Sequence, residues 1–153
     1  MIKLTVKQLL DATARKVPLN GSLEDGMVKN GSALDRLYAL DKPIHVAWAN
    51  RKQAAACNEE LKHYHEKRLA LCEKFGVKNE TLNVFEFDGC NSEFSAKSPG
   101  PQKLAFDAAL IELWNQEIEL PGRPIKIFEL ADSELTGSLS EFDCQLLEPF
   151  LAD

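Results

Sequence analysis

The chain is short of cysteine and of long apolar runs, and both shortages exclude structural classes. Its 153 residues include four cysteines without a CxxC pair, and no apolar run approaches the ~20 residues of a bilayer-spanning helix. Cys57 and Cys72 fall on one predicted helix, about 22 Å apart at the α-helical rise, far beyond the ~7 Å limit for a disulfide. Charges at Lys3, Lys7 and Asp11 interrupt any secretory signal core. We therefore expect buried thiols in a reducing compartment, either a cytoplasm or a particle assembled there.

The sequence also lacks the motifs of the common catalytic and cofactor-binding sites. It has no G-x-S-x-G, no P-loop and no G-x-G-x-x-G. His63 and His65 are two residues apart, which places them on nearly opposite sides of a helix, whereas two metal ligands on one face need a spacing of three or four. We therefore predict a protein that is not an enzyme, with no catalytic residues, no metal, no cofactor and no small-molecule substrate.

Charge is distributed unevenly along the chain, whose formal net charge is −6. Residues 42–78 carry eight basic and four acidic residues, whereas residues 79–153 carry four basic and fifteen acidic residues. The simplest interpretation is self-complementarity, in which acids of the second half pair with basic residues of the first. Two alternatives are nucleic-acid binding by the basic segment and mimicry of nucleic acid by the acidic half. Interspersed acids and the absence of an aromatic platform argue against nucleic-acid binding.

The strongest predicted element is a long helix over residues 42–75. No glycine or proline interrupts the chain between Pro43 and Gly76, and proline suits a first helical turn as glycine suits a helix end. Such a helix extends about 50 Å, which is about three times the mean helix length. Its apolar stripe advances in alternating steps of four and three, like a coiled-coil seam. The stripe consists of Cys57, Leu61, Tyr64, Arg68, Leu71 and Phe75.

A second helix is predicted over residues 101–116, after the sequence Ser98-Pro99-Gly100-Pro101. A helix that is apolar over much of its surface is expected to lie between partners. Its two adjoining apolar stripes are Leu104, Ala108 and Ile111, and Phe106, Leu110 and Leu113. We predict that this helix packs antiparallel on the long one, as a helical hairpin with unequal arms.

Shorter elements are predicted at both ends of the chain. Capping-box patterns at Thr5/Gln8, Ser32/Asp35 and Ser138/Glu141 predict three helix starts. Residues 117–120 and 125–128 are expected as strands around a Pro-Gly-Arg-Pro turn, with Met1–Leu4 as a third strand. These strands would form a small mixed or antiparallel sheet from the termini and residues 118–128.

Residues 77–98 are expected to form a β-arm at the tip of the hairpin. Residues 81–87 alternate as a strand, Asp88-Gly89 is typical of a hairpin turn, and residues 92–96 would return as the partner strand. An arm this small has no core of its own, so its phenylalanines need packing from elsewhere. We predict that Phe85, Phe87 and Phe94 anchor an intermolecular contact.

The expected fold is therefore a mainly α protein of the α+β class. It forms a single domain over residues 1–153, with residues 20–31 as a loop insertion and residues 77–98 as the β-arm insertion.

Both ends of the chain carry segments that resemble a known group of proteins. These segments are MIKLTVKQLLDA and the run Glu117-Ile118-Glu119-Leu120-Pro121-Gly122-Arg123-Pro124-Ile125, followed by Leu130 and an ending in EPFLAD. They resemble small proteins of unassigned function from tailed bacteriophages and prophages, which share a KLT…LL helix, a long charged helix and an E-hydrophobic-E-L strand. The resemblance covers both ends and the central hairpin, and it implies a phage origin without transferring any site residue.

Together these features predict a non-catalytic protein–protein interaction protein. The expected role is a structural or assembly component of a tailed bacteriophage virion that works as an oligomer. Its partners would be phage structural proteins or further copies of itself, and it would not bind a membrane. It would be located in the virion or in the host cytoplasm. The alternative is an acidic inhibitor of a host defence or nucleic-acid-processing enzyme.

Overall fold

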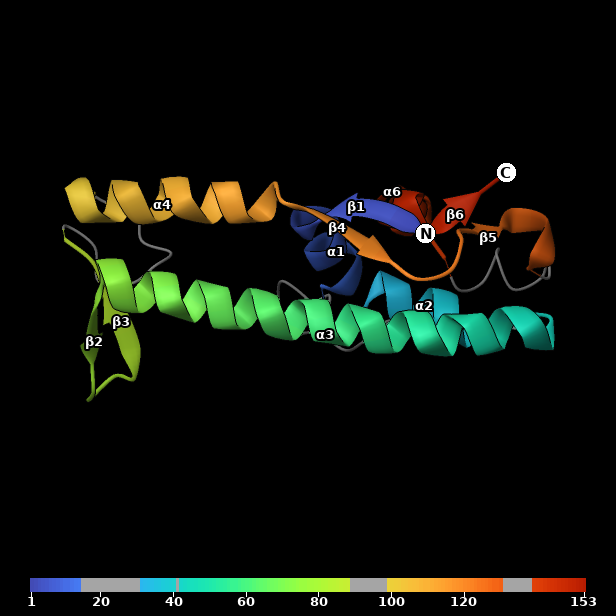
Figure 1. Ribbon diagram of the computed structural model, residues 1–153, viewed down its shortest axis with the longest axis horizontal. Coiled ribbons are helices and arrows are strands. Elements are labelled where there is room, and N and C mark those ends of the chain that lie inside the picture. Colours follow the sequence, from blue (N-terminus) through green and yellow to red (C-terminus); the bar gives the residue numbers. More distant parts are fainter. Residues whose placement is uncertain (15–30, 41, 89–98, 131–138) are drawn as a thin grey trace, which may run out of the picture. The chain divides into compact units, whose positions relative to one another are not determined.

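The computed structural model describes residues 1–14, 31–40, 42–88, 99–130 and 139–153. These residues are mainly helical and contain small sheets of two strands each, so the predicted class is confirmed (Figure 1). They divide into two compact units, where a single domain was expected. Unit 1 comprises Met1–Asn58 and Glu117–Asp153, and unit 2 comprises Glu59–Gln116. The long helix α3, Ile44–Phe75, contributes to both units.

Unit 1 begins with a strand that leads directly into a helix. Strand β1 (Ile2–Thr5) pairs antiparallel with β4 (Glu117–Leu120), and its alternating side chains Ile2 and Leu4 are buried. The following helix α1 (Val6–Thr13) starts with the predicted capping box. The Thr5 hydroxyl accepts the backbone N–H of Gln8 at 3.2 Å, and the Gln8 side chain accepts the N–H of Thr5 at 2.8 Å. The N-terminal strand and its pairing with residues 117–120 are therefore as predicted.

Two further helices of unit 1 also start at capping boxes. Ser32 and Asp35 cap α2 (Ala33–Ala39), as predicted. Helix α6 (Glu141–Leu146) begins two residues later than expected, because its capping residue is Ser140 and the acid three positions on is Asp143. Ser138 lies outside the described residues.

The expected strand over 125–128 is corrected by the structure. Strand β5 (Ile125–Lys126) pairs in parallel with β6 (Leu151–Ala152), and it gives way to the 3₁₀ turn η1 (Ile127–Glu129). The change of direction occurs at Gly122, whose φ of +89° favours glycine, within a turn that contains two prolines. Another 3₁₀ turn, η2 (Glu148–Phe150), precedes β6.

The core of unit 1 gathers side chains from these elements. Helix α3 presents one face to this core, at steps of four and three residues. That face consists of Val46, Asn50, Gln53 and Cys57. The fully buried apolar residues of the unit are Leu9, Ala12, Ala33, Leu37, Leu120, Ile125, Leu147 and Phe150. Two of the four side chains on this face of α3 are amides, which makes the core polar where α3 crosses it.

Unit 2 contains part of the predicted β-arm. Strand β3 (Val84–Glu86) pairs antiparallel with β2 (Val77–Asn79), a partner that the sequence analysis did not predict. The predicted partner, residues 92–96, lies outside the described residues. The turn between the strands is stabilised by Asn79, whose side-chain oxygen accepts the backbone N–H groups of Thr81 and Leu82. Asn83 adopts a left-handed φ of 52°, which asparagine tolerates.

Asp88, expected to begin a hairpin turn with Gly89, caps the helix that follows, while Gly89 lies outside the described residues. Its carboxylate accepts the backbone N–H groups of Gln102 and Lys103, at 3.0 and 2.8 Å, at the start of α4 (Pro101–Trp114). A Cβ atom on Gly100 would lie 2.3 Å from the Asp88 carboxylate, so only glycine fits at this position. An aspartate that precedes glycine can thus serve as a remote helix cap.

Helix α4 contacts the part of α3 that belongs to unit 2. The indole N–H of Trp114 donates to the Tyr64 hydroxyl at 3.0 Å, while Phe106 packs near Cys72. The later of the two α4 residues, Trp114, therefore contacts the earlier of the two α3 residues, Tyr64. Tyr64, Leu71 and Phe75 of the predicted seam take part in these contacts or in the adjoining core.

Candidate interaction surfaces

The predicted aromatic anchors of the β-arm are not all available to a partner. Phe87 is 5% exposed, and its ring lies 4.6 Å from that of Phe106, centroid to centroid. Phe87 therefore packs on its own chain, where α4 supplies the packing that the arm lacks, and this burial argues against its predicted role as an intermolecular anchor. Phe85 is half-buried beside the same core cluster and stays a predicted anchor. Phe94 lies outside the described residues.

An exposed stripe on α3 is the first candidate surface. It consists of Ile44, Trp48, Arg51 and Ala55 and is called here the α3 stripe. Ile44 is 84% exposed and Trp48 is 60% exposed, and the Arg51 guanidinium lies 5.8 Å from the centroid of the Trp48 ring. The steps of four, three and four residues are those of a coiled-coil seam, on the side of α3 opposite its buried face. The α3 stripe thus has the spacing needed to receive another helix.

A second exposed stripe lies on α4 in unit 2. Leu104, Ala108 and Ile111, called here the α4 stripe, are exposed, whereas Phe106 and Leu113 on the neighbouring stripe are buried. The sequence predicted that both stripes of this helix pack against partners. Among the described residues, only the stripe that contains Phe106 and Leu113 is covered by its own unit.

Phe128 is an exposed aromatic that the sequence analysis did not single out. It is 74% exposed, and the Lys126 ammonium lies 5.5 Å from its ring centroid. The sequence placed it in a strand, where alternation leaves one face exposed, but η1 turns it outward together with Ile127. Phe150, close to the end of the sequence, is by contrast fully buried.

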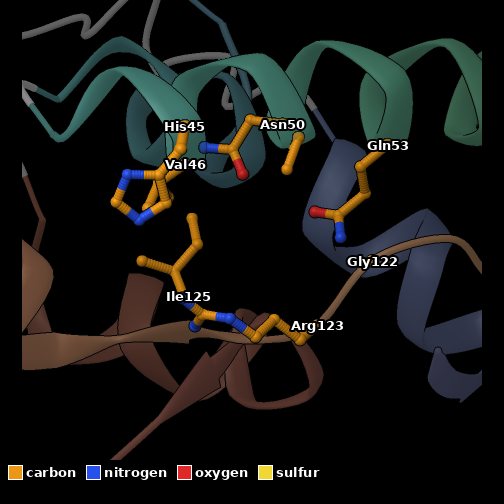
Figure 2. Close-up of a pocket in the computed structure, with 8 residues that line it drawn as sticks. His45, Val46, Asn50, Gln53, Gly122, Arg123 and Ile125 are labelled. Carbon is orange, nitrogen blue, oxygen red and sulfur yellow. The ribbon is translucent and has the colours of Figure 1, made fainter.

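A small pocket in unit 1 lies between the first turns of α3 and the segment after β4 (Figure 2). Its volume is about 70 Å³. Its lining residues are His45, Val46, Ala49, Asn50, Gln53, Gly122, Arg123 and Ile125. At its inner end the amide of Gln53 is fully engaged, because its oxygen accepts the Tyr38 hydroxyl and its nitrogen donates to the Pro121 carbonyl. Burial raises the pKa of Tyr38, so this phenol stays neutral and remains a donor.

Arg123 at the rim of this pocket forms an ion pair with Glu129. Arg123 Nη1 donates to Glu129 Oε2 at 3.0 Å, and Nη2 donates to Oε1. The backbone N–H of Lys126 also donates to Oε2, at 3.0 Å. Hydrogen bonding from Arg123 is the main reason that the pKa of Glu129 falls from 4.5 to about 2.

We predict that the Arg123→Gln variant restores an ordinary titration of Glu129. In the wild type the carboxyl should titrate near pH 2, and in the variant near 4.5, as measured by ¹³C NMR of the side-chain carboxyl. Because the folded pKa is the lower one, the pair stabilises the fold above pH 4.5, and this contribution is lost as the pH falls from 4.5 to 2. Arg51→Gln, an exposed arginine elsewhere in unit 1, serves as the control. An unchanged Glu129 midpoint in Arg123→Gln would refute the assignment.

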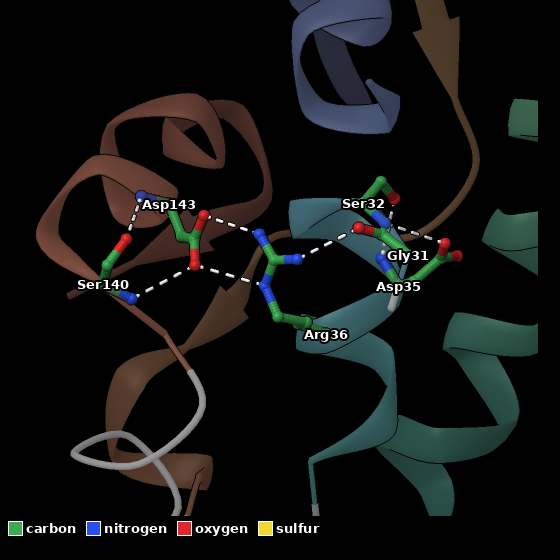
Figure 3. Close-up of polar contacts among 6 residues, drawn as sticks. All are labelled: Gly31, Ser32, Asp35, Arg36, Ser140 and Asp143. Carbon is green, nitrogen blue, oxygen red and sulfur yellow. Dashed lines mark hydrogen bonds and ion pairs between the residues drawn. The ribbon is translucent and has the colours of Figure 1, made fainter. Parts of the chain in front are cut away.

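A buried ion pair joins two helices of unit 1 (Figure 3). Arg36 of α2 donates to Asp143 of α6 through Nε at 3.2 Å and Nη2 at 2.7 Å, and through Nη1 to the Gly31 carbonyl at 3.1 Å. The two side chains are 7% and 1% exposed. Asp143 also accepts the backbone N–H of Ser140, so one carboxylate both caps α6 and neutralises Arg36. The sequence marked neither residue for this role, because 107 positions separate them.

The remaining chemistry is sparse within the ranges that the structure describes. No group of three or more His, Cys, Asp or Glu side chains there could hold a metal ion. No helix formed by the described residues is long and apolar enough to cross a bilayer. Comparison of the chain with protein-family models, curated proteins and solved structures finds no match.

Proposed function

We propose that this protein is a non-catalytic protein–protein interaction protein that works as an oligomer, as a structural or assembly component of a tailed bacteriophage. The observation that carries the oligomer is the pair of exposed apolar stripes, one in each unit, at helical-seam spacing. The phage context rests on the resemblance of both chain ends to small tailed-phage proteins.

The exposure of the stripes favours a binding role over a solvated surface. Each Å² of apolar surface that moves from water into a contact stabilises the complex by about 25 cal/mol. Single exposed apolar residues are common, but rows of them at steps of four and three are typical of surfaces that receive a helix. Trp48 is the best anchor among them, since tryptophan is enriched at the energetic centre of interfaces.

The contacts of α3 with α4 support a helical hairpin as the scaffold of the α4 stripe. The earlier residue of α3, Tyr64, contacts the later residue of α4, Trp114, while the later Cys72 packs with the earlier Phe106. This reversed order is the pattern of antiparallel helices. In this proposal the hairpin buries the stripe that contains Phe106 and Leu113 and presents the α4 stripe to a partner.

The charges beside the two stripes favour a second copy of this chain as the partner. Exposed Arg51 belongs to the α3 stripe and exposed Lys52 adjoins it, whereas exposed Glu112 adjoins the α4 stripe. Opposite charges at the flanks of helical seams select partner and orientation. The α3 stripe of one copy would therefore receive the α4 stripe of the next, a head-to-tail contact that closes into a ring or continues as a filament.

The acids of the second half support self-complementarity rather than mimicry of nucleic acid. Glu119 pairs with Lys3 and Asp143 with Arg36, both bases of the first half, whereas Glu129 pairs with Arg123 within the second half. A carboxylate held by its own chain is not displayed to a basic partner.

We predict that Trp48→Glu dissociates the oligomer. A buried tryptophan anchor contributes about 2 kcal/mol or more, so the dissociation constant should rise by about 30-fold or more, as measured by sedimentation velocity over a range of concentrations. Leu69→Glu, which changes a half-exposed leucine of α3 outside both stripes, should associate like the wild type. A wild type that is monomeric at every concentration would refute the oligomer. Mass spectrometry of purified virions tests the phage role, since absence from particles would leave only an assembly role.

A further inference from the structure

The pocket between α3 and the segment after β4 holds a buried polar group whose hydrogen bonding is incomplete. The Asn50 side chain is 6% exposed, and its Nδ2 has no hydrogen-bond partner among the described residues. Figure 2 shows the Asn50 amide projecting from α3 toward the segment that carries Arg123 and Ile125. Buried amide donors are almost always paired, so one that lines an open pocket indicates a missing partner.

The neighbours of Asn50 are not able to complete its hydrogen bonding. Gln53, one turn along α3, already uses its oxygen for Tyr38 and its nitrogen for Pro121. Val46, Ala49 and Ile125 contribute only apolar surface to the walls, and His45 adds an imidazole to the lining. The pocket thus combines apolar walls and an imidazole with the Asn50 amide, which can both donate and accept.

We propose that this pocket binds an amide group of a polypeptide. Asn50 Nδ2 would donate to the carbonyl oxygen of the bound amide, and Asn50 Oδ1 would accept its N–H, which gives a two-point pair. The inference is independent of the proposed function, because it uses neither the α3 stripe nor the α4 stripe.

Charge and size favour a neutral amide over other small groups. Arg123 at the rim is neutralised by Glu129, so no unbalanced guanidinium remains to select a carboxylate. A carboxylate would also place its second oxygen against Asn50 Oδ1, where only a donor is favourable. An ammonium group cannot accept from Nδ2. The volume of about 70 Å³ is far below that of pockets for drug-sized ligands, about 300 Å³ and upward, but suits one functional group.

The test is a titration of the full-length ¹⁵N-labelled protein with small probes, followed by NMR. Acetamide represents a side-chain carboxamide, and N-methylacetamide represents a peptide bond. The probe that binds more tightly shows which of these two amides the pocket prefers. We expect saturable millimolar shifts of the Asn50 side-chain NH₂ and of the Ile125 methyl groups. Acetate and methylammonium should bind at least about tenfold more weakly. Acetate binding as tight as acetamide, or no saturable shift with either amide, would overturn the proposal.

Two variants separate binding from folding. Asn50→Leu replaces the amide by an apolar group of similar size, so it should abolish the acetamide shifts of Ile125 and raise the thermal midpoint of the free protein. Ala49→Leu should block the pocket while Asn50 stays in place, which keeps the test valid if Asn50→Leu fails to fold. Asn58→Leu, at an exposed asparagine of α3, should leave the acetamide shifts unchanged. Retention of the Ile125 shifts in both pocket variants would overturn the proposal.

Discussion

Replacing Asp143 by alanine should destabilise unit 1 by about 3–5 kcal/mol, the usual cost of removing one partner of a buried ion pair. Arg36 would keep its hydrogen bond to the Gly31 carbonyl but lose both hydrogen bonds to the Asp143 carboxylate. Loss of the α6 capping box would add about 1 kcal/mol. The measurement is urea unfolding followed by circular dichroism. A free energy of unfolding of about 5–15 kcal/mol is typical of proteins, so this loss would be a large fraction of the total.

Asp35→Ala is the matched control for this experiment. Asp35 occupies the same position in the capping box of α2 as Asp143 does in α6, but it is exposed. Its replacement removes a cap alone and should cost about 1 kcal/mol. The double variant Arg36→Met/Asp143→Ala removes both charges and should be more stable than Asp143→Ala. Equal losses in Asp143→Ala and Asp35→Ala would show that the ion pair contributes nothing.

The helix starts of this protein could be predicted because their determinants are local. Thr5 with Gln8, and Ser32 with Asp35, each place a hydroxyl and its partner three residues apart, and both boxes form as predicted. The ambiguous case was the last helix, where two serines compete and the structure uses Ser140. The long helix was equally predictable, since no glycine or proline interrupts it.

The partners of strands β3 and β5, and the pocket, could not be predicted from the sequence. Asp88-Gly89 has the local chemistry of a hairpin turn, but the carboxylate binds the start of α4, 14 residues further on. Asn50 was not singled out, because nothing in the sequence shows that residues 122–125 lie opposite it. Which side chains meet across such distances depends on tertiary packing, whereas periodicity reports only on a single element.

Replacing Phe87 by alanine should destabilise unit 2 by about 3–5 kcal/mol, the usual cost of truncating a buried phenylalanine. Phe87 covers Phe106, which is fully buried, and also contacts the core near Cys72. Trp114 of unit 2 is a convenient probe, because its indole N–H is bonded to Tyr64. A Trp48→Phe background removes the other tryptophan, so that urea unfolding followed by fluorescence reports on unit 2 alone.

The same variant decides between a core and an interface role for the arm. Phe128→Ala, at an exposed phenylalanine of unit 1, is the control and should change the free energy of unfolding by no more than about 0.5 kcal/mol. If Phe87 belongs to the core, Phe87→Ala lowers the urea midpoint of the Trp114 signal even at concentrations where the protein is monomeric. If Phe87 is an interface anchor, the monomer midpoint stays at the wild-type value and only the dissociation constant rises. The 5% exposure of Phe87 and its contact with Phe106 predict the first outcome, because a side chain already covered by its own chain has little area left to bury against a partner.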